Sequence, residues 1–263
     1  MATDSVRAET TSEPGPVLSV VVPVFNEAST LEVCMGRVFA SDCGVSFEVI
    51  AVDDGSSDGS LGILERCQQE HSGLQVLRHE HNQGKGAALR TAFAVANGQY
   101  VLVQDADLEY DPQDYRLLLS PLLDGRADVV YGSRFLGGAG RAHLYFNYLA
   151  NRFLTTVSNV FTNLNLTDME TGYKVFRRDV AQRLDIRSPS FAVEPEMTAK
   201  AARMGARIFE VAISYNGRDY EEGKKIRWTD GLAGLWAILR FNLFPGRIER
   251  LQRPPPGTGP VSD

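Results

Sequence analysis

Apolar runs of strand length alternate along this chain with segments whose apolar residues recur at helical spacing. Amphipathic helices are expected at 26–40, 56–71 and 85–97. The strand-like runs between and after them are LSVVVPVF, FEVIAVDD, LQVLRHE, QYVLVQDAD and DVVYGSRF, at 18–25, 47–54, 74–80, 99–107 and 128–135. Continuous apolar strands separated by helices are typical of a parallel sheet that is covered on both faces. We therefore predict an α/β fold with a mostly parallel, doubly covered, Rossmann-like sheet.

Three of these strand-like runs end in polar side chains. Asn26 and Glu27 follow the first run, Asp53 and Asp54 end the second, and Asp105 and Asp107 end the fourth. In open α/β sheets, ligands bind beyond the carboxyl ends of the strands. Three polar strand ends at one edge of the sheet favour a binding site there.

The acidic pair in DAD, at 105–107, predicts a cation. Asp105 and Asp107 are two residues apart in an extended segment, so their side chains can share a face. Mg²⁺ commonly binds one or two carboxylates together with substrate phosphates, and such a cation relieves the repulsion between the carboxylates. Glu109, two residues further on, is a third candidate ligand. The pattern favours Mg²⁺ or Mn²⁺, although a turn or a helix cap also explains so short a motif.

Two further segments suit a nucleotide. In VDDGSSDGS, at 52–60, a capping turn explains the serines, whereas Asp53 or Asp54 can accept a hydrogen bond from a base or a ribose. NQGKGAALR, at 82–90, lacks the spacing of a P-loop. Its Lys85 between two glycines nevertheless predicts a tight turn with a lysine close to phosphate.

Composition narrows the class of partner and the compartment. A formal charge of −6 argues against a nucleic-acid partner. The three cysteines form no CxxC pair, so a reducing cytoplasm is the expected setting, and neither a signal peptide nor a membrane span is expected. The most apolar segment, at 231–244, is expected to be a helix packed on the domain. A membrane-lying face is the alternative, formed by Leu232, Leu235, Trp236, Leu239, Phe241 and Leu243.

Taken together, the motifs carry a resemblance to a known family. VVPVFNE, VDDGSSDGS, NQGKGAALR, DADLE and GSRF occur here in the order seen in family-2 glycosyltransferases of the GT-A fold. The resemblance covers roughly residues 17–230, and it is strongest to the dolichyl- or polyprenyl-phosphate sugar synthases. Phe25 stands where the family often has Tyr, and Glu109 stands where Gln is frequent. Neither change removes an expected role, because Phe can still stack and Glu can still ligate a cation.

This resemblance implies a nucleoside-diphosphate sugar donor, either a UDP-hexose or a GDP-hexose. Asp105 and Asp107 match the metal-binding DxD motif, whose cation holds the donor diphosphate. A bound cation stabilises the charge that develops on the departing diphosphate. The implied donor site comprises Pro23, Phe25, Glu27, Val52, Asp53, Asp54, Lys85, Asp105, Ala106 and Arg134.

The second half of the chain is expected to hold the acceptor. In relatives that attack with a hydroxyl, an acidic residue near 191–203 acts as general base, which makes Glu194 the first candidate and Asp168 the second. Acidic residues at the start of a helix also suit its dipole, so a structural role for Glu194 stays open. A phosphate acceptor needs cations instead. Arg218 and Lys224 reproduce the R-x5-K spacing of the polyprenyl-phosphate sugar synthases, and they follow a final strand expected at 213–218.

The sequence therefore predicts an inverting transfer of a hexose to polyprenyl phosphate, with Asp107, Glu194, Arg218 and Lys224 as catalytic residues. One GT-A domain is expected at 16–230, with an amphipathic helix at 231–250 and disordered tails at 1–15 and 251–263. A lipid acceptor implies peripheral contact with the cytoplasmic face of a membrane. Two alternatives stay open: transfer to a soluble hydroxyl acceptor, and a nucleotide-sugar-binding protein without turnover.

Overall fold

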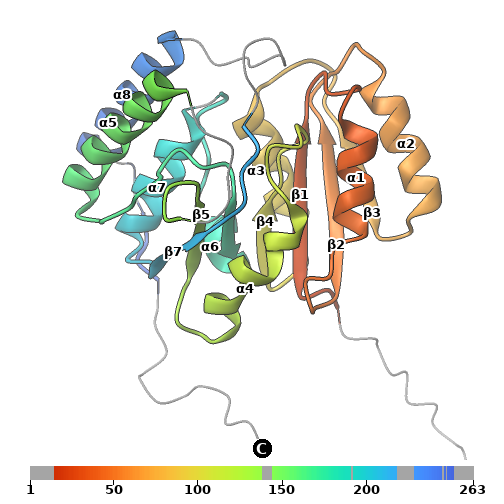
Figure 1. Ribbon diagram of the computed structural model, residues 1–263, viewed down its shortest axis with the longest axis horizontal. Coiled ribbons are helices and arrows are strands. Elements are labelled where there is room, and N and C mark those ends of the chain that lie inside the picture. Colours follow the sequence, from red (N-terminus) through yellow and green to blue (C-terminus); the bar gives the residue numbers. More distant parts are fainter. Residues whose placement is uncertain are drawn as a thin grey trace, which may run out of the picture.

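The computed structural model describes residues 15–137, 144–190, 192–217, 228–244, 246 and 248–251. These residues contain one sheet of seven strands in the order β3-β2-β1-β4-β6-β5-β7 (Figure 1). The tails expected at 1–15 and 251–263 lie outside the described residues, apart from Gly15 and Leu251. The strands are β1 (Leu18–Val24), β2 (Phe47–Asp53), β3 (Leu74–Arg78), β4 (Tyr100–Val103), β5 (Val129–Ser133), β6 (Lys174–Arg177) and β7 (Ile208–Ala212).

Most of the sheet is parallel, as predicted. Strand β1 lies between β2 and β4 and is parallel to both, with Val21 opposite Ile50 on one side and Val103 on the other. Strand β6 is the exception, because it runs antiparallel to both of its neighbours, β4 and β5. The carboxyl ends of β1, β2, β4 and β5 therefore meet at the same edge of the sheet.

The final strand lies earlier than the sequence predicts. Strand β7 ends at Ala212, and beyond it Tyr215 makes only an isolated bridge with Tyr110. Ile213 still donates its N–H to the carbonyl oxygen of Ser133 in β5 at 3.2 Å, but the backbone beyond it bonds to the segment that follows β4. Ser214 donates its N–H to the Asp114 carboxylate at 2.7 Å, and Asn216 donates to the carbonyl oxygen of Glu109 at 2.9 Å. The strand expected at 213–218 is thus wrong over 213–217, the part of it that the structure describes.

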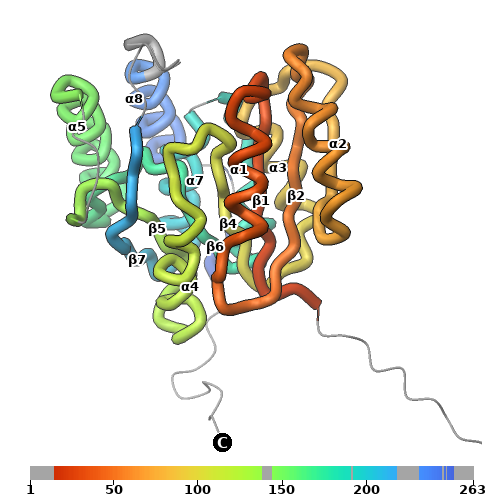
Figure 2. The backbone as a smooth tube through the Cα atoms, turned by 45° about the vertical axis from the view of Figure 1, so that its right-hand side comes forward, coloured from red at the N-terminus to blue at the C-terminus, as the bar shows by residue number. Residues whose placement is uncertain are grey.

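Helices cover both faces of the sheet (Figures 1 and 2). Each face has its own apolar core. Alternate side chains of β1 enter opposite cores, since Val20 and Val22 pack on one face and Val21 on the other. The first face carries α1 (Leu31–Phe39), α2 (Ser60–Glu70) and α4 (Tyr115–Leu123). The second carries α3 (Lys85–Val95), α5 (Tyr145–Thr162), α6 (Arg178–Arg183), α7 (Val193–Arg203) and α8 (Trp228–Leu243).

Helix α8 differs in extent from the expected helix at 231–250. It begins at Trp228 and ends at Leu243, and it packs against α5 and α7. Buried Ile238 joins the core of the second face. No helix within the described ranges has the length and apolar character needed to cross a membrane.

Candidate active site

The loops after β1 and β2 are fastened together at the carboxyl edge of the sheet. Asn26 adopts a left-handed backbone with φ of 53°, and its N–H donates to the Ser56 hydroxyl at 3.0 Å. The N–H of Glu27 donates to the Ser60 hydroxyl, also at 3.0 Å. These bonds fix the backbone ahead of α1, which begins at Leu31. They also hold the segment with the predicted donor residues Pro23, Phe25 and Glu27 against the loop that follows Val52 and Asp53.

Asp53 and Asp54 are both buried, yet their surroundings differ. Asp54 Oδ1 lies 2.6 Å from His79 Nδ1, and Asp54 Oδ2 accepts the N–H of Gly84 at 2.7 Å. Asp54 therefore secures the loop that leads into α3. Asp53 Oδ2 accepts the N–H of Ser56 at 3.4 Å, whereas Asp53 Oδ1 is buried without a hydrogen-bond partner. Of the two carboxylates, Asp53 is the one with an oxygen that no protein group satisfies.

Lys85 is the first residue of α3, and it bridges two carboxylates. Its Nζ lies 2.8 Å from Asp105 Oδ1 and 3.1 Å from Glu194 Oε1. Burial alone would lower the pKa of Lys85, but Asp105 and Glu194 raise it above its ordinary value. Gly84 permits this placement, because its φ is 90° and a Cβ there would collide with the carbonyl oxygen of Pro189. Lys85 thus provides a fixed positive charge at the end of β4.

A second lysine holds the other oxygen of Glu194. Lys174 begins β6 and is completely buried, and its Nζ lies 2.6 Å from Glu194 Oε2. It also donates to the carbonyl oxygens of Met169 and Thr171. Burial would raise the pKa of Glu194, but Lys174 and Lys85 lower it below its ordinary value. Glu194 is therefore an ionised, doubly paired carboxylate.

The pKa of Glu170 is shifted in the opposite direction to that of Glu194. Burial, with the nearby Glu194 carboxylate, raises the pKa of Glu170 to about 7. Its Oε1 is buried without a hydrogen-bond partner and faces Gly234 of α8. Two neighbouring carboxylates thus differ in their protonation near neutral pH, because only Glu194 is flanked closely by lysines.

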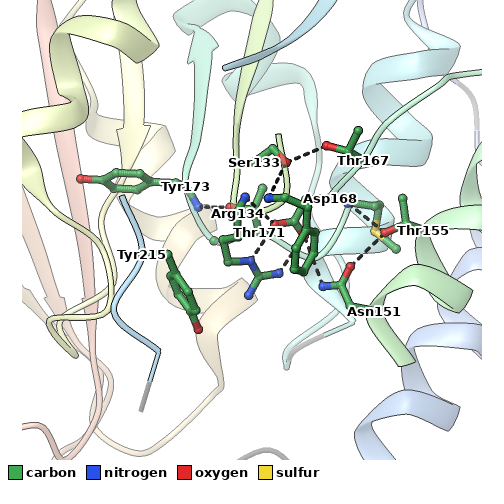
Figure 3. A network of polar contacts seen from close by, with 12 residues as sticks. Ser133, Arg134, Asn151, Thr155, Thr167, Asp168, Thr171, Tyr173 and Tyr215 are labelled. Carbon is green, nitrogen blue, oxygen red and sulfur yellow. Dashed lines mark hydrogen bonds and ion pairs between the residues drawn. The ribbon is translucent and has the colours of Figure 1, made fainter. Parts of the chain in front are cut away.

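Arg134 follows β5 and forms a bidentate pair with Asp168 (Figure 3). Arg134 Nε lies 2.6 Å from Asp168 Oδ2, and a terminal nitrogen of the guanidinium lies 2.7 Å from Asp168 Oδ1. Asn151 of α5 donates to the same carboxylate at 3.2 Å. Burial would raise the pKa of Asp168, but Arg134 lowers it below its ordinary value. The guanidinium also lies over the ring of Tyr215, at 5.1 Å from the ring centroid.

The acidic residues after β4 create a negative electrostatic potential around Cys34. Burial raises the pKa of the Cys34 thiol to about 12, and the Asp107 and Asp105 carboxylates contribute to the rise. Asp105 packs so closely on Gly172 that a Cβ on this glycine would collide with Asp105 Oδ2. Ala106, between the two acids, is buried and accepts a hydrogen bond from the Thr30 hydroxyl at 2.9 Å.

The donor set at this position fits a divalent cation held by two carboxylates. No group of three or more His, Cys, Asp or Glu side chains in the described part of the chain converges as a metal cluster. Two carboxylates, completed by diphosphate oxygens, suffice for Mg²⁺. Asp105 already forms an ion pair with the Lys85 ammonium, so its carboxylate faces positive charge. Glu109 Oε2 accepts the Tyr215 hydroxyl at 2.6 Å, so this third candidate has a protein partner.

Of the residues predicted from the sequence, the structure brings Lys85 into contact with Asp105 and Glu194, and Arg134 into contact with Asp168. Arg218 and Lys224 lie outside the described residues. Lys174, Glu170 and Asn151 enter the site without having been singled out. Lys174 and Glu170 belong to TDMETGYKVFRRD, where neither residue stands out, because a lysine in a strand and an acidic residue in a turn are common. Asn151 lies on α5, a helix that the sequence analysis did not predict.

Comparisons with known proteins agree with this geometry. The glycosyl transferase family 2 model matches residues 19–185. Undecaprenyl-phosphate mannosyltransferase of Micrococcus luteus is 30% identical over 246 residues, covering 85% of this chain and 97% of that protein. Polyprenol monophosphomannose synthase of Mycolicibacterium smegmatis is 28% identical over 243 residues, covering 88% of each.

A solved structure shows the same fold. Glucosyl-3-phosphoglycerate synthase from Mycobacterium tuberculosis, in complex with Mn²⁺, UDP and glucosyl-3-phosphoglycerate, superposes with a TM-score of 0.65. The two proteins are 20% identical, and the match covers 88% of this chain and 82% of that one. The predicted GT-A fold is confirmed. With the family model matched over more than half of its length, the chain belongs to glycosyl transferase family 2.

Proposed function

We propose that this enzyme transfers a hexose from a nucleoside-diphosphate sugar to a polyprenyl phosphate, with inversion at the anomeric carbon. The observation that carries the proposal is a row of alternating charges along the carboxyl edge of the sheet. It runs from Asp105 through Lys85 and Glu194 to Lys174. Arg134 follows β5 at the same edge, so a site for a cation-bound diphosphate adjoins a site for a second anion.

The donor half of the site is formed by the loops after β1, β2 and β4. Asp53 Oδ1 offers a buried acceptor for an N–H of the base or a hydroxyl of the ribose. Phe25, which is half-exposed beyond β1, offers an apolar surface for stacking. Asp105 and Asp107 would hold Mg²⁺ or Mn²⁺ against the diphosphate, and the cation would act there as a Lewis acid for the leaving group.

The acceptor half needs cations rather than a base. A phosphate oxygen is ionised near neutral pH, whereas placing one anion beside another costs electrostatic energy. Arg134 is held in a fixed orientation by Asp168, and a guanidinium suits phosphate because it carries further N–H donors besides the two that bind this carboxylate. Arg218 and Lys224 would add two more positive charges.

In the reaction, the acceptor phosphate oxygen forms a bond to the anomeric carbon as the bond from that carbon to the diphosphate breaks on the opposite side. No proton is transferred in this step. Glu194 has no role as a base here, because both of its oxygens are paired with lysines and its pKa is low. Its role is to hold Lys85 beside Asp105 and to neutralise Lys174.

The experiment is a matrix of donors and acceptors. Purified protein with Mn²⁺ is incubated with UDP- and GDP-hexoses, with either a short-chain polyprenyl phosphate or the corresponding free alcohol. Released nucleoside diphosphate and the lipid product are measured. We expect product only with the phosphate and only with divalent cation. Transfer to a hydroxyl acceptor, with none to the phosphate, would contradict the proposal.

A further inference from the structure

Helix α5 presents an apolar stripe to solvent. Phe146, Leu149, Phe153 and Val160 are all exposed, and Phe146 is 81% exposed. Their spacing of three, four and seven residues places them on one side of the helix. The opposite side of α5 is buried through Leu154, Thr155 and Ser158. The stripe is therefore an outward face of the helix and not part of either core.

Helix α8 continues this apolar character. Leu232 and Trp236 are 58% and 62% exposed, and Leu243 is 55% exposed. The face differs from the one predicted, because Phe241 is buried near Lys200. Leu235 and Leu239 are half-buried. The exposed part of α8 is therefore narrower than the sequence predicts, whereas α5 adds a second apolar helix.

The two helices pack side by side at the edge of the molecule farthest from α2 (Figures 1 and 2). Ten of the exposed large apolar side chains of the described residues lie on them. An exposed apolar surface of this extent marks an interaction site. We call this surface the α5–α8 face, and its exposed large apolar residues are Tyr145, Phe146, Tyr148, Leu149, Phe153, Val160, Phe161, Leu232, Trp236 and Leu243.

The charge of this region differs from that of the rest of the chain. No Asp or Glu occurs between Asp128 and Asp168, although the chain carries 33 acidic residues and a formal charge of −6. The one charged residue of α5 is Arg152, which is exposed, whereas α8 has Asp230 in its first turn and Arg240 in its last. An anionic surface would repel most of this protein but not the α5–α8 face.

We infer that the α5–α8 face lies on an anionic lipid bilayer, with its aromatic side chains inserted at the level of the headgroups. Tyr, Trp and Phe beside arginine suit this interface, because the rings enter the apolar region while the cation stays near lipid phosphate. A second copy of the chain is the less suitable occupant, since it would bring together two copies of α5, whose one charged residue is Arg152.

This orientation deepens the proposed function, because it places the acceptor half of the site next to the membrane. On the side of α5 away from its exposed stripe, Asn151 contacts Asp168, which in turn holds Arg134 (Figure 3). A helix with its side chains is about 10–12 Å across. Arg134 therefore lies roughly one helix thickness from the bilayer surface, within reach of a phosphate at the headgroup level.

The test is co-sedimentation of the full chain with vesicles, without any substrate. We expect binding to vesicles of phosphatidylglycerol and phosphatidylcholine, and weaker binding to phosphatidylcholine alone. Phe146→Ser and Trp236→Ser should each weaken binding by about tenfold or more, because each removes a side chain that is buried in lipid. Leu117→Ser on α4, which removes a side chain that is 53% exposed elsewhere on the surface, is the matched control and should bind normally.

Two further measurements separate the possible results. Both serine variants should fold as wild type and should transfer hexose normally to a water-soluble, short-chain prenyl phosphate, because the substituted side chains lie in solvent. Binding to neither vesicle, or equal binding by all variants, would overturn the inference. Dimerisation in analytical ultracentrifugation that the variants abolish, without vesicle binding, would assign the face to a second copy. Vesicle binding as expected, without transfer to any prenyl phosphate, would refute the proposed function alone.

Discussion

Replacing Glu194 by Gln separates a structural carboxylate from a general base. Glu194 lies 2.6 Å from Lys174 and 3.1 Å from Lys85, and Lys174 is completely buried. Removing one partner of a buried ion pair typically costs ~3–5 kcal/mol. Lys174 would keep two carbonyl acceptors, and Lys85 would keep Asp105. We therefore expect Glu194→Gln to lower the free energy of unfolding by ~3 kcal/mol, measured by urea denaturation at pH 7.5.

The pH dependence of this loss has a definite sign. Because the folded-state pKa of Glu194 is below its ordinary value of 4.5, its stabilisation is present above that pH. It is lost as the pH falls through the folded-state pKa, so wild type and variant should converge in stability under acidic conditions. Glu196→Gln is the matched control. Glu196 is equally buried on α7, 2.6 Å from Lys200, and takes no part in the site.

Activity then decides the role of Glu194. A positioned general base contributes ~10²–10⁴-fold. We expect kcat for polyprenyl phosphate to fall less than about tenfold in Glu194→Gln, and we expect a higher half-saturating Mn²⁺ concentration, because Lys85 would then pair with Asp105 alone. The assay is diphosphate release between pH 5 and 9. A fall of more than a hundredfold, with loss of an acidic limb in the pH profile and normal activity of Glu196→Gln, would refute this reasoning.

Five further substitutions test other residues of the proposed site and of its surroundings. Glu170→Gln should raise the melting temperature at pH 8 but not at pH 4. The pKa of Glu170 is raised to about 7 in the folded protein. The wild-type protein therefore loses stability as the pH rises from about 4.5 to 7, because the buried carboxylate resists ionisation, and Gln avoids this loss. Asp53→Asn should raise the KM for the nucleotide sugar about ten- to a hundredfold, the equivalent of a charged hydrogen bond; an unchanged KM would remove Asp53 from the donor site. Asp107→Ala should abolish transfer while circular dichroism stays unchanged, and near-normal turnover at saturating Mn²⁺ would exclude a metal role. Arg218→Ala and Lys224→Ala should each cost about ten- to a hundredfold in transfer to polyprenyl phosphate, with Mn²⁺ binding unaffected; wild-type kinetics would favour a soluble acceptor.

The parallel half of this fold follows directly from its sequence. The segments Val20–Val22 and Val101–Val103 are apolar at every position, because both faces of β1 and β4 are covered. Their polar ends then lie at one edge as a consequence of parallel topology. The same reasoning fails at 213–218, where side chains alternate as in a strand but Asp114 and Glu109 take the backbone hydrogen bonds. Such competition arises between segments about 100 residues apart and leaves no local pattern.

Only part of the candidate site could be predicted from the sequence, because contacts between distant segments determine the rest. Asp105 and Asp107 can be found because a strand precedes them, and Lys85 because glycines flank it. The choice between Asp53 and Asp54 depends on where His79 and Gly84 lie, which the sequence does not show. Lys174 is a more severe case, since a lysine that is completely buried in a strand has no sequence signature. The two carbonyls and the carboxylate that hold it are brought together only by the fold.

The antiparallel direction of β6 determines where the loop before it lies. A parallel strand in its place would have its amino-terminal loop at the far edge of the sheet. Because β6 is antiparallel to β4 and β5, the loop that precedes Lys174 instead spans the gap between the Asp105 and Arg134 ends of those strands. It is anchored by the Asp168–Arg134 pair at its start and by the sheet at its end. In the proposed reaction this loop would hold the leaving group and the nucleophile a fixed distance apart, and segments outside the sheet would then select among acceptors of different bulk.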